Sequence, residues 1–563
     1  MTVFGIDLGT SNSSISFWDG EKVQLVPNQH GERLTPSVIS LDETGEVLIG
    51  KIAKERLLTH PERTVSTFKR FMGTKKSYKI GDTSFTPVEL SSLILTSLKN
   101  SAEQFLNEPC EEAVISVPAY FNTIQREVTM EAAKLAGLTV TNLISEPTAA
   151  AVAYGLTKKE DQMILVLDLG GGTFDVSLLD LFEGVMQVEA TAGDNYLGGE
   201  DFTQVLIQDF YEKNQIETST LSLQEQGKVY QKMEQAKREL GQDNAVNVCL
   251  ELNQKEYTYQ LTPSEYERLL EQLLLRMKLP ISRVLKDSDV TLAEIDQVIL
   301  VGGATRLNLV RRYFAKLLKV FPNSHLNPDE VVTLGAAIHA ELKQETIKKE
   351  LILTDVSAYS LGVDAVRQTE NGYINDVFVP IIERNTTIPA SKMNYFYTVV
   401  ENQRKMAFIV YQGENAKASE NLKVGEIVID LPKRTPKDYP VACRFTYDNN
   451  GIIEVILEDE KNGHKEKLII EENPGSLTPE EIQASLEKLA ALKILPEDQA
   501  ENRMLLARVE RLYSETLGNK REQIQGLLFD FQAILKTQDR KLIQQRYREL
   551  SKIVDGLERD IWL

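Results

Sequence analysis

The chain has 563 residues, and at roughly 150 residues per domain this length predicts three or four domains. Apolar residues make up 42 % of the chain and charged residues 26 %, which excludes collagen-like, purely coiled-coil and wholly disordered proteins. The 83 Asp and Glu residues outnumber the 63 Lys and Arg residues, and the resulting net charge of -20 disfavours sequence-independent nucleic-acid binding.

Cysteine, histidine and apolar patterns exclude further classes. Cys110, Cys249 and Cys443 lie too far apart in the sequence to form a CxxC pair, and the 5 histidines show no metal-binding spacing. We therefore expect incidental reduced thiols and no transition-metal site. The N-terminus has no signal-peptide pattern, and no stretch reaches the roughly 18 apolar residues of a membrane helix. These features predict a cytoplasmic, soluble protein that binds neither membranes nor nucleic acid.

An internal repeat organises about the first 340 residues. The segment 3–10, VFGIDLGT, returns as VLDLGGGT at 166–173, and each is an apolar run, an aspartate, glycines and a hydroxyl residue. Two more pairs follow in the same order: apolar runs at 113–118 and 297–303, and helix starts at 146–151 and 329–337. Three ordered pairs predict two homologous α/β lobes with a cleft between them.

The two glycine turns would face this cleft from opposite sides. Their backbone N–H groups can bind phosphate oxygens, and so can four nearby hydroxyl residues: Thr10, Ser11, Ser13 and Thr173. Asp7 and Asp168 can hold Mg²⁺ through its water molecules. The alternative is two ordinary glycine turns with exposed aspartates, which the ordered repeat disfavours. No GxxxxGK[ST] motif occurs, so a P-loop mechanism is excluded.

A pocket for the nucleoside has weaker signals. Glu234, Lys237 and Arg238 share one helical face, and Gly302–Gly303 precedes Arg306 after an apolar run. Each pattern has an ordinary alternative, namely a solvated helix face or a strand-to-helix turn.

Seven ordered motifs make the chain resemble the DnaK-type, seventy-kilodalton heat-shock chaperones, within the wider actin and sugar-kinase ATPase superfamily. They are GIDLGTSNSS from Gly5, VPAYFNTIQR from Val117, ISEPTAAAVAYG from Ile144, LDLGGGTFDVS from Leu167, GDNYLGGEDF from Gly193, VGGATR from Val301 and NPDEVVTLGAA from Asn327. The short C-terminal region is most similar to the specialised bacterial HscC branch. The resemblance implies an actin-like duplicated α/β ATPase domain at 1–345, a linker at 346–356, an all-β peptide-binding sandwich at 357–475 and a short α-helical lid at 476–563.

The resemblance also implies slow hydrolysis of ATP to ADP with Mg²⁺, and K⁺ as a candidate additional ion. The implied catalytic residues are Lys69, Glu146, Asp168, Thr173 and Asp175. Lys69 would hold the attacking water, Asp175 would orient it, and Glu146 would link the magnesium shell to domain coupling. The implied nucleotide contacts are Asp7, Gly9, Thr10, Ser11, Asn12, Gly170, Gly171, Gly172, Thr173, Gly198, Gly199, Glu234, Lys237, Arg238, Gly302, Gly303, Arg306 and Asp329, with Mg²⁺ held by Asp7 and Asp168 through water.

Two departures from relatives lie in the ATPase region. Ala304 and Gly241 replace residues that are often polar in relatives, which predicts a reduced nucleotide affinity. The segment after Gly73 is short before the helix expected near Val88, so one peripheral subdomain should be smaller.

A polar segment at 341–350 leads into the apolar run LILTDV at 351–356. A bare tether would be polar throughout, so this linker should dock against protein in at least one state. The resemblance implies that it carries the ATP signal, although Thr354 replaces an apolar residue common in relatives. The implied coupling residues are Pro118, Arg126, Leu351, Ile352, Leu353 and Asp355; local turn and ion-pair roles are the alternative.

Residues 357–475 predict β structure, because short alternating runs are separated by Asn-Gly turns. The run 406–411 is apolar on both faces, so its second face meets either another apolar object or a core on both sides. The resemblance assigns peptide contacts to Val363, Ala365, Val366, Phe396, Val399, Met406 and Phe408. Bulky Phe396, Met406 and Phe408 predict a narrow pocket and a small client range.

Helical spacing returns at Thr478, where Thr478-Pro479 is a good helix start and Ile482, Leu486, Leu489 and Leu492 form an apolar stripe.

The leading hypothesis is an ATP-dependent chaperone of unfolded or specific clients, with roles in protein folding and the stress response. Asn142 stands where relatives place a basic J-domain contact, which predicts a dedicated J-domain partner; an exchange factor remains open. The alternatives are a small-molecule kinase and an exchange-factor or holdase relative.

Overall fold

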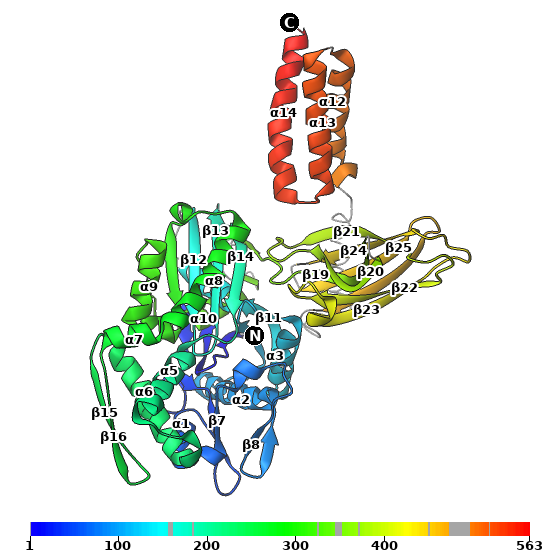
Figure 1. Cartoon of the computed structure of the whole chain (residues 1–563). Helices are drawn as coiled ribbons and strands as arrows, with labels where there is room; N and C mark the ends of the chain where they lie inside the picture. The colour runs from blue at the N-terminus through cyan, green and yellow to red at the C-terminus, as the bar shows by residue number, and fades with distance from the viewer. Residues whose placement is uncertain are drawn as a thin grey trace.

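Two mixed sheets of equivalent topology form the centre of the first part of the chain (Figure 1). In each sheet three antiparallel strands are extended by a parallel strand, β10 beside β1 and β17 beside β12. The first sheet has the order β11-β10-β1-β2-β3, with β4 paired to β2: β1 Val3–Asp7, β2 Asn12–Trp18, β3 Val23–Leu25, β4 Thr35–Pro36, β10 Glu112–Val117, β11 Thr139–Ser145. The second has the order β17-β12-β13-β14-β18: β12 Gln162–Leu169, β13 Phe174–Phe182, β14 Val185–Asp194, β17 Gln297–Val301, β18 Ile352–Thr354.

This computed structural model describes residues 2–155, 161–182, 185–323, 326–343, 352–369, 372–448, 451–471, 496–516 and 518–562. No helix within those ranges is both long and apolar enough to cross a membrane.

Helices α4 (Glu146–Gly155) and α10 (Val331–Lys343) contact each other between the two sheets. A Cβ atom at Gly335 would lie 1.7 Å from the Ala149 carbonyl oxygen, so the helices can approach this closely only with small residues at the crossing. The small-residue runs that the sequence repeats therefore hold the two lobes together.

The remaining helices and small sheets surround these two sheets. The helices are α1 Lys51–Thr59, α2 Pro87–Leu106, α3 Thr123–Leu135, α5 Gly199–Asn214, α6 Leu223–Leu240, α7 Pro263–Leu269, α8 Glu271–Ser288 and α9 Asn308–Leu318. Short 3-10 helices include η2 Phe68–Phe71 and η5 Gly303–Arg306. The small sheets are β5 Val38–Leu41, β6 Val47–Ile49 and β7 Thr64–Ser66; β8 Tyr78–Ile80 and β9 Thr83–Phe85; β15 Val246–Leu252 and β16 Lys255–Leu261. Only the short β8–β9 hairpin separates η2 from α2, as the brief segment after Gly73 predicts.

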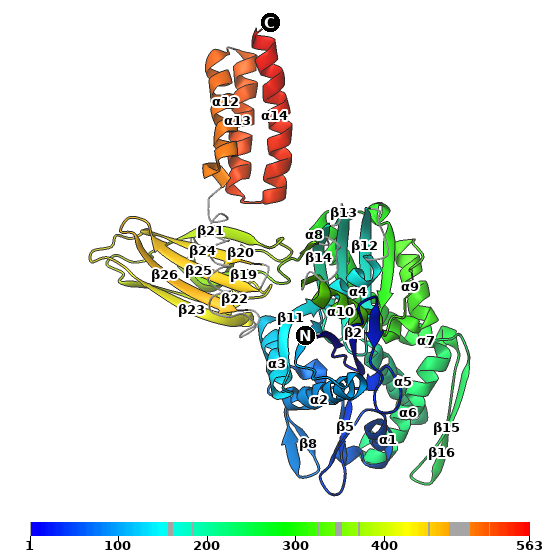
Figure 2. The same ribbon diagram turned by 180° about the vertical axis from the view of Figure 1, so that it is seen from behind.

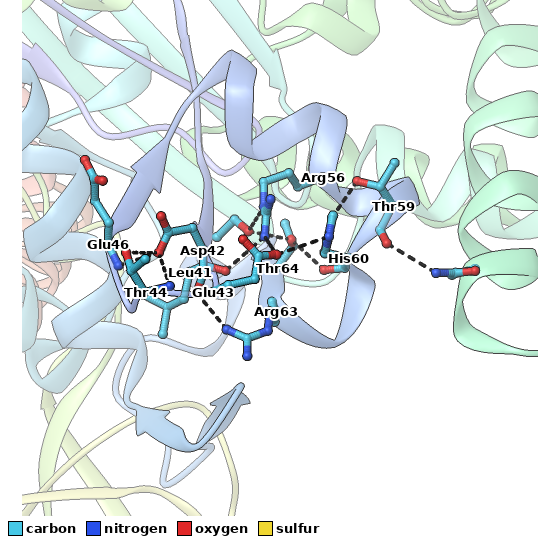
Figure 3. Close-up of polar contacts among 12 residues, drawn as sticks. Leu41, Asp42, Glu43, Thr44, Glu46, Arg56, Thr59, His60, Arg63 and Thr64 are labelled. Carbon is cyan, nitrogen blue, oxygen red and sulfur yellow. Dashed lines mark hydrogen bonds and ion pairs between the residues drawn. The ribbon is translucent and has the colours of Figure 1, made fainter.

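A polar network shapes the corner of the first lobe that faces α6 (Figure 3). Arg56 of α1 donates to the Leu41 carbonyl oxygen at 3.2 Å, and Arg63 donates to the Asp42 carbonyl oxygen at 2.7 Å. Across the lobe boundary, Gln224 of α6 donates to the exposed Thr59 carbonyl oxygen at 3.3 Å. Hydrogen bonds thus hold α1 and the residues that follow it within the first lobe, and Thr59 contacts the second lobe at an exposed position.

The region after the linker is a β sandwich of two four-stranded sheets. One sheet is β20-β19-β22-β23 and the other is β21-β24-β25-β26: β19 Leu361–Thr369, β20 Gly372–Ile382, β21 Ala390–Tyr397, β22 Lys405–Gln412, β23 Leu422–Asp430, β24 Pro440–Tyr447, β25 Ile452–Asp459, β26 His464–Glu471. Gly451 and Gly463 have φ values of 82° and 69°, which suits glycine turns between the last three strands. The predicted turn residues 371 and 449–450 lie outside the described residues.

The linker strand and the sandwich both contact the second lobe (Figures 1 and 2). Strand β18 adds in parallel to the edge of β14. Arg384 of the sandwich pairs with Asp287 of α8 at 2.7 Å, and Thr191 of β14 donates its backbone N–H to Asn385 at 3.0 Å. The linker strand and the sandwich are therefore docked on the ATPase region in this structure.

Three C-terminal helices form a separate bundle beyond the sandwich (Figure 2). They are α12 Ala500–Glu515, α13 Asn519–Lys536 and α14 Arg540–Trp562, with a buried apolar core of their own. Gln538, between α13 and α14, makes two 3.0 Å hydrogen bonds to the backbone of Met393 in β21. The predicted helix start at Thr478 and the stripe at 482–492 lie outside the described residues.

Candidate nucleotide and peptide sites

A cavity of about 460 Å³ opens between the lobes. It brings together most of the predicted residues: Asp7, Gly9, Thr10, Ser11, Asn12, Lys69, Glu146, Asp168, Gly170, Gly171, Thr173, Gly199, Glu234, Lys237, Arg238, Gly302, Gly303, Arg306 and Asp329. The departures Gly241 and Ala304 also line it. Gly172, Gly198 and Asp175 lie behind this lining. The repeated turns therefore meet in one space of a size suited to a small ligand.

The first glycine turn owes its shape to buried serines. Ser13 accepts a hydrogen bond from the Gly9 N–H at 3.1 Å, and Ser37 donates to the Gly9 carbonyl oxygen at 2.7 Å. Ser13 is fully buried and also bonds Ser37, so it does not face the cleft. The expectation that Ser13 contacts phosphate is wrong, because its hydroxyl is used to fold the turn, whereas Thr10 and Ser11 line the cavity.

The second glycine turn is held by the start of α5. The first N–H groups of the helix, from Gly199 and Glu200, donate to the carbonyl oxygens of Gly170 and Gly171 at 2.9 Å each. A Cβ atom on Gly198 would lie 2.4 Å from the nitrogen of Gly172. Gly172 and Gly198 are therefore needed for close packing of the turn against α5, and they do not line the cavity.

Buried carboxylates lie around Lys69 at one end of the cavity. Lys69 Nζ lies 2.8 Å from Glu146 Oε1, and both side chains are buried. Burial, together with the charge of Glu146, raises the pKa of Asp7 to about 6 and the pKa of Asp168 well above its usual range.

Asp175 lies one layer deeper. It accepts the Tyr120 backbone N–H at 3.3 Å, while its Oδ2 atom is buried without a hydrogen-bond partner. Burial, followed by the charge of Glu146, raises its pKa to about 8. An acid excess of this kind suits a bound divalent cation. Mg²⁺ usually keeps several of its waters, so these carboxylates could hold a hydrated Mg²⁺ through water.

The nucleoside end is built on α6. Glu234 pairs with Lys237 and accepts a hydrogen bond from Thr203 at 2.7 Å, and Lys237 also donates to the Gly199 carbonyl oxygen at 2.9 Å. Arg238 is 65 % exposed at its side chain. The three residues therefore border the cavity instead of forming only a solvated face.

Opposite α6, Arg306 of η5 pairs with Asp329 at 2.6 Å. Sequence reasoning missed further lining residues: Leu34, Glu200, Tyr230, Gln242, Val301, Leu307, Pro328 and Val332. Tyr230 precedes Glu234 by four residues on α6, so helical spacing could have found it. Leu34 comes from a loop of the other lobe and has no local signal.

The predicted peptide residues range from buried to exposed. Val363, Met406 and Phe408 are buried in the sandwich core, and the Phe396 ring meets Phe408 edge-on with 5.2 Å between centroids. Val366 is 44 % exposed. The other two predicted residues, Ala365 and Val399, are half-buried.

Strand β22 alternates as a half-exposed strand does. Met406, Phe408 and Val410 are buried, whereas Ala407 is exposed and Ile409 is half-buried. A core on both sides of this strand is therefore not what the structure has.

The predicted coupling residues lie between the cavity and the sandwich. Pro118 is buried after β10, and Arg126 of α3 donates to the Phe121 carbonyl oxygen at 3.4 Å. Asp355 follows β18, in which Ile352 and Leu353 pair with Val185 and Met186. Leu351 lies outside the described residues. Thr354 Oγ1 is buried and has no hydrogen-bond partner.

The sequence also matches a known protein family. A family model described as Hsp70 protein matches residues 3–81 and 76–561. The chain belongs to the Hsp70 family. Members of the Hsp70 family are ATP-dependent chaperones that hydrolyse ATP, bind ATP or ADP with Mg²⁺, and generally act on unfolded client peptides with J-domain cochaperones. The family architecture is an actin-like ATPase domain followed by a β sandwich and a helical lid.

Proposed function

We propose that this Hsp70 is an ATP-driven chaperone in which the nucleotide in the cleft controls capture and release of extended apolar segments by the β sandwich. One observation carries the proposal, namely the contact path between the two sites. Tyr120 donates its N–H to Asp175, which lies behind the cavity lining, and accepts at its carbonyl oxygen from Tyr359 Oη at 2.8 Å. The two tyrosine rings also meet, with 4.3 Å between centroids. We also propose the domain limits 1–345, 346–356, 357–475 and 476–563.

The proposed reaction is hydrolysis of ATP to ADP and phosphate. Bound Mg²⁺ would neutralise charge on the phosphates. N–H groups and hydroxyls of the two glycine turns would bind phosphate oxygens, and Lys69 Nζ would hold the attacking water beside the terminal phosphate. Asp175 would act on that water from behind the cavity lining, and Glu146 would transmit the change to α4.

The role of Lys69 has a direct test. Replacing Lys69 with Ala should slow single-turnover hydrolysis by about 100-fold or more, since the water loses its cationic partner. Hydrolysis at the normal rate would show that the assignment is wrong. Replacing K⁺ with Na⁺ in the same assay tests the proposed additional ion.

We further propose a narrow client range. The bulk of Phe396 and Phe408, whose rings meet edge-on, is the feature that supports a narrow or shallow pocket. A peptide array should then show few, related binders. A broad leucine-centred preference would contradict this point.

Partner choice is proposed from Asn142. Asparagine is uncharged, so Asn142 offers no positive charge to an acidic J-domain signature. Its side-chain amide contacts His339 of α10 at 2.9 Å. This lack of charge supports a dedicated J-domain partner. The short C-terminal region is the feature that supports assignment to the bacterial HscC branch, and a cytoplasmic location and a stress-related role are proposed with that assignment. Stimulation by one J-domain protein in single-turnover hydrolysis, and not by others, would support it; equal stimulation by all, or by none, would contradict it.

ATP turnover measured with and without an apolar peptide separates the proposed function from its alternatives. The chaperone predicts stimulation by peptide with no phosphorylated product. A kinase predicts a phosphorylated small molecule, and a passive holdase predicts no turnover. The family assignment and the docked linker strand favour the first outcome.

A further inference from the structure

Two adjacent residues of η2 extend to different parts of the structure. Lys69 lines the cavity and pairs with Glu146 of the first lobe. Arg70 does not line the cavity and instead crosses to the second lobe, where its Nη2 atom lies 2.8 Å from Asp201 Oδ2. The side chains of Arg70 and Asp201 are only 12 % and 25 % exposed. The lobes are therefore joined by a largely buried ion pair next to the residue that would hold the attacking water.

Asp201 belongs to the turn of α5 that holds the second glycine turn. Its Oδ2 atom also accepts the Gly198 N–H at 2.8 Å, which fixes the carboxylate at the helix start. From this same start, the N–H groups of Gly199 and Glu200 bind Gly170 and Gly171. A displacement of Asp201 would therefore move the start of α5 and, through these two backbone hydrogen bonds, the turn that would bind the phosphates.

The stem of Arg70 lies directly over the same glycine turn. A Cβ atom at Gly172 would come within 2.8 Å of both Cγ and Cδ of Arg70. The Arg70 Nε atom is buried and has no hydrogen-bond partner, so the side chain gives up one hydrogen bond to reach Asp201. Arg70 therefore packs its stem against the glycine turn while its head group contacts Asp201 of the second lobe.

We propose that Arg70 is a positioning residue of the ATPase reaction, whose ion pair with Asp201 is a latch that holds the lobes closed at the phosphate turn. The latch keeps Lys69 aligned with the terminal phosphate and must break before nucleotide leaves. This inference rests on the proposed function, because it takes the cleft to be the ATP site. Removal of one partner of a buried pair is costly, since the other charge is left unpaired.

The test is the release rate of a fluorescent ADP analogue, together with single-turnover hydrolysis, in the full chain. Arg70→Met and Asp201→Asn should each speed ADP release by about tenfold or more, which corresponds to about 1.4 kcal/mol. Asn at 201 keeps an acceptor for the Gly198 N–H, so this variant removes the charge without removing the cap. Both variants should lower the hydrolysis rate more than they weaken ATP binding.

Three further variants make the test specific. The double variant should release ADP no faster than the faster single variant, because both changes break one pair. Arg70→Lys should recover part of the loss. Gln224→Ala removes the exposed cross-lobe contact at Thr59 (Figure 3) and should change release less than about twofold.

Several outcomes overturn the latch. Normal release and hydrolysis in Asp201→Asn, or additive effects in the double variant, would contradict it while leaving the proposed function intact. A wild-type chain that binds no ADP would overturn both. If Arg70→Met fails to fold, as seen from its thermal midpoint, Asp201→Asn and Arg70→Lys decide the question.

Discussion

At the residue scale, the carboxylates around Lys69 are protonated more readily than free carboxylic acids. The pKa of Asp7 is raised to about 6 and that of Asp175 to about 8, mainly by burial. In the ligand-free protein, the folded state therefore binds these protons more tightly than the unfolded state does. Their contribution to stability is complete below the ordinary aspartate pKa of 3.8 and is lost as the pH rises through about 6 and then about 8.

Magnesium and nucleotide should reverse this preference. A divalent cation favours the ionised carboxylates, so Mg·ADP binding should release protons at neutral pH and should weaken as the pH falls below about 6. Titration calorimetry in two buffers of different ionisation enthalpy measures the number of protons released. The same heat in both buffers at pH 7 would contradict the account, and ADP without Mg²⁺ is the control.

At the element scale, the linker strand β18 contains one unfavourable group. The buried Thr354 hydroxyl has no partner, and such a group costs about 1–3 kcal/mol. Thr354→Val keeps the branched shape and should hold β18 more firmly against β14. Hydrogen exchange of the amides at 352–354 should slow by about tenfold in the variant. Thr258→Val, on the exposed face of β16, is the control.

Faster or unchanged exchange at 352–354 would contradict the prediction that the hydroxyl weakens docking. The apolar linker predicts docking from composition alone. Its partner strand could not be predicted, because the edge of β14 is exposed only by the order of the second sheet.

A second element-scale prediction concerns the contact between Tyr120 and Tyr359. Tyr359→Phe keeps the ring contact and removes the hydrogen bond to the Tyr120 carbonyl oxygen. The ratio of peptide-stimulated to basal ATP hydrolysis should fall by about twofold to tenfold, the equivalent of one hydrogen bond. An unchanged ratio would show that this path does not couple the sites. Tyr373→Phe, exposed on β20, is the control.

The repeats and glycine motifs could be predicted from sequence because each depends on local spacing. They anticipated β1, β12 and the small-residue helices α4 and α10. The direction of single side chains could not be predicted in the same way. Ser13 turned inward to bond Gly9, and Gly172 proved to be a packing position beneath Arg70. Both outcomes depend on neighbours that are distant in sequence.

At the scale of the whole molecule, the three or four domains expected from length become a two-lobed ATPase region, a sandwich and a helical bundle (Figure 1). Among the described residues, the sandwich is joined to the ATPase region by a strand, an ion pair and the tyrosine contact, and the bundle makes two hydrogen bonds to β21. This distribution of contacts favours the linker and sandwich face as the route between nucleotide and client.

The central claim is that nucleotide controls the client site, and the most direct test is the dissociation rate of a fluorescent apolar peptide. A peptide first selected from the array is bound to the ADP form, and then ATP or more ADP is added. The account predicts that ATP speeds dissociation by about tenfold or more and that Lys69→Ala, which should still bind ATP but hydrolyse it about 100-fold more slowly, responds equally. The same dissociation rate with ATP and ADP would contradict the account.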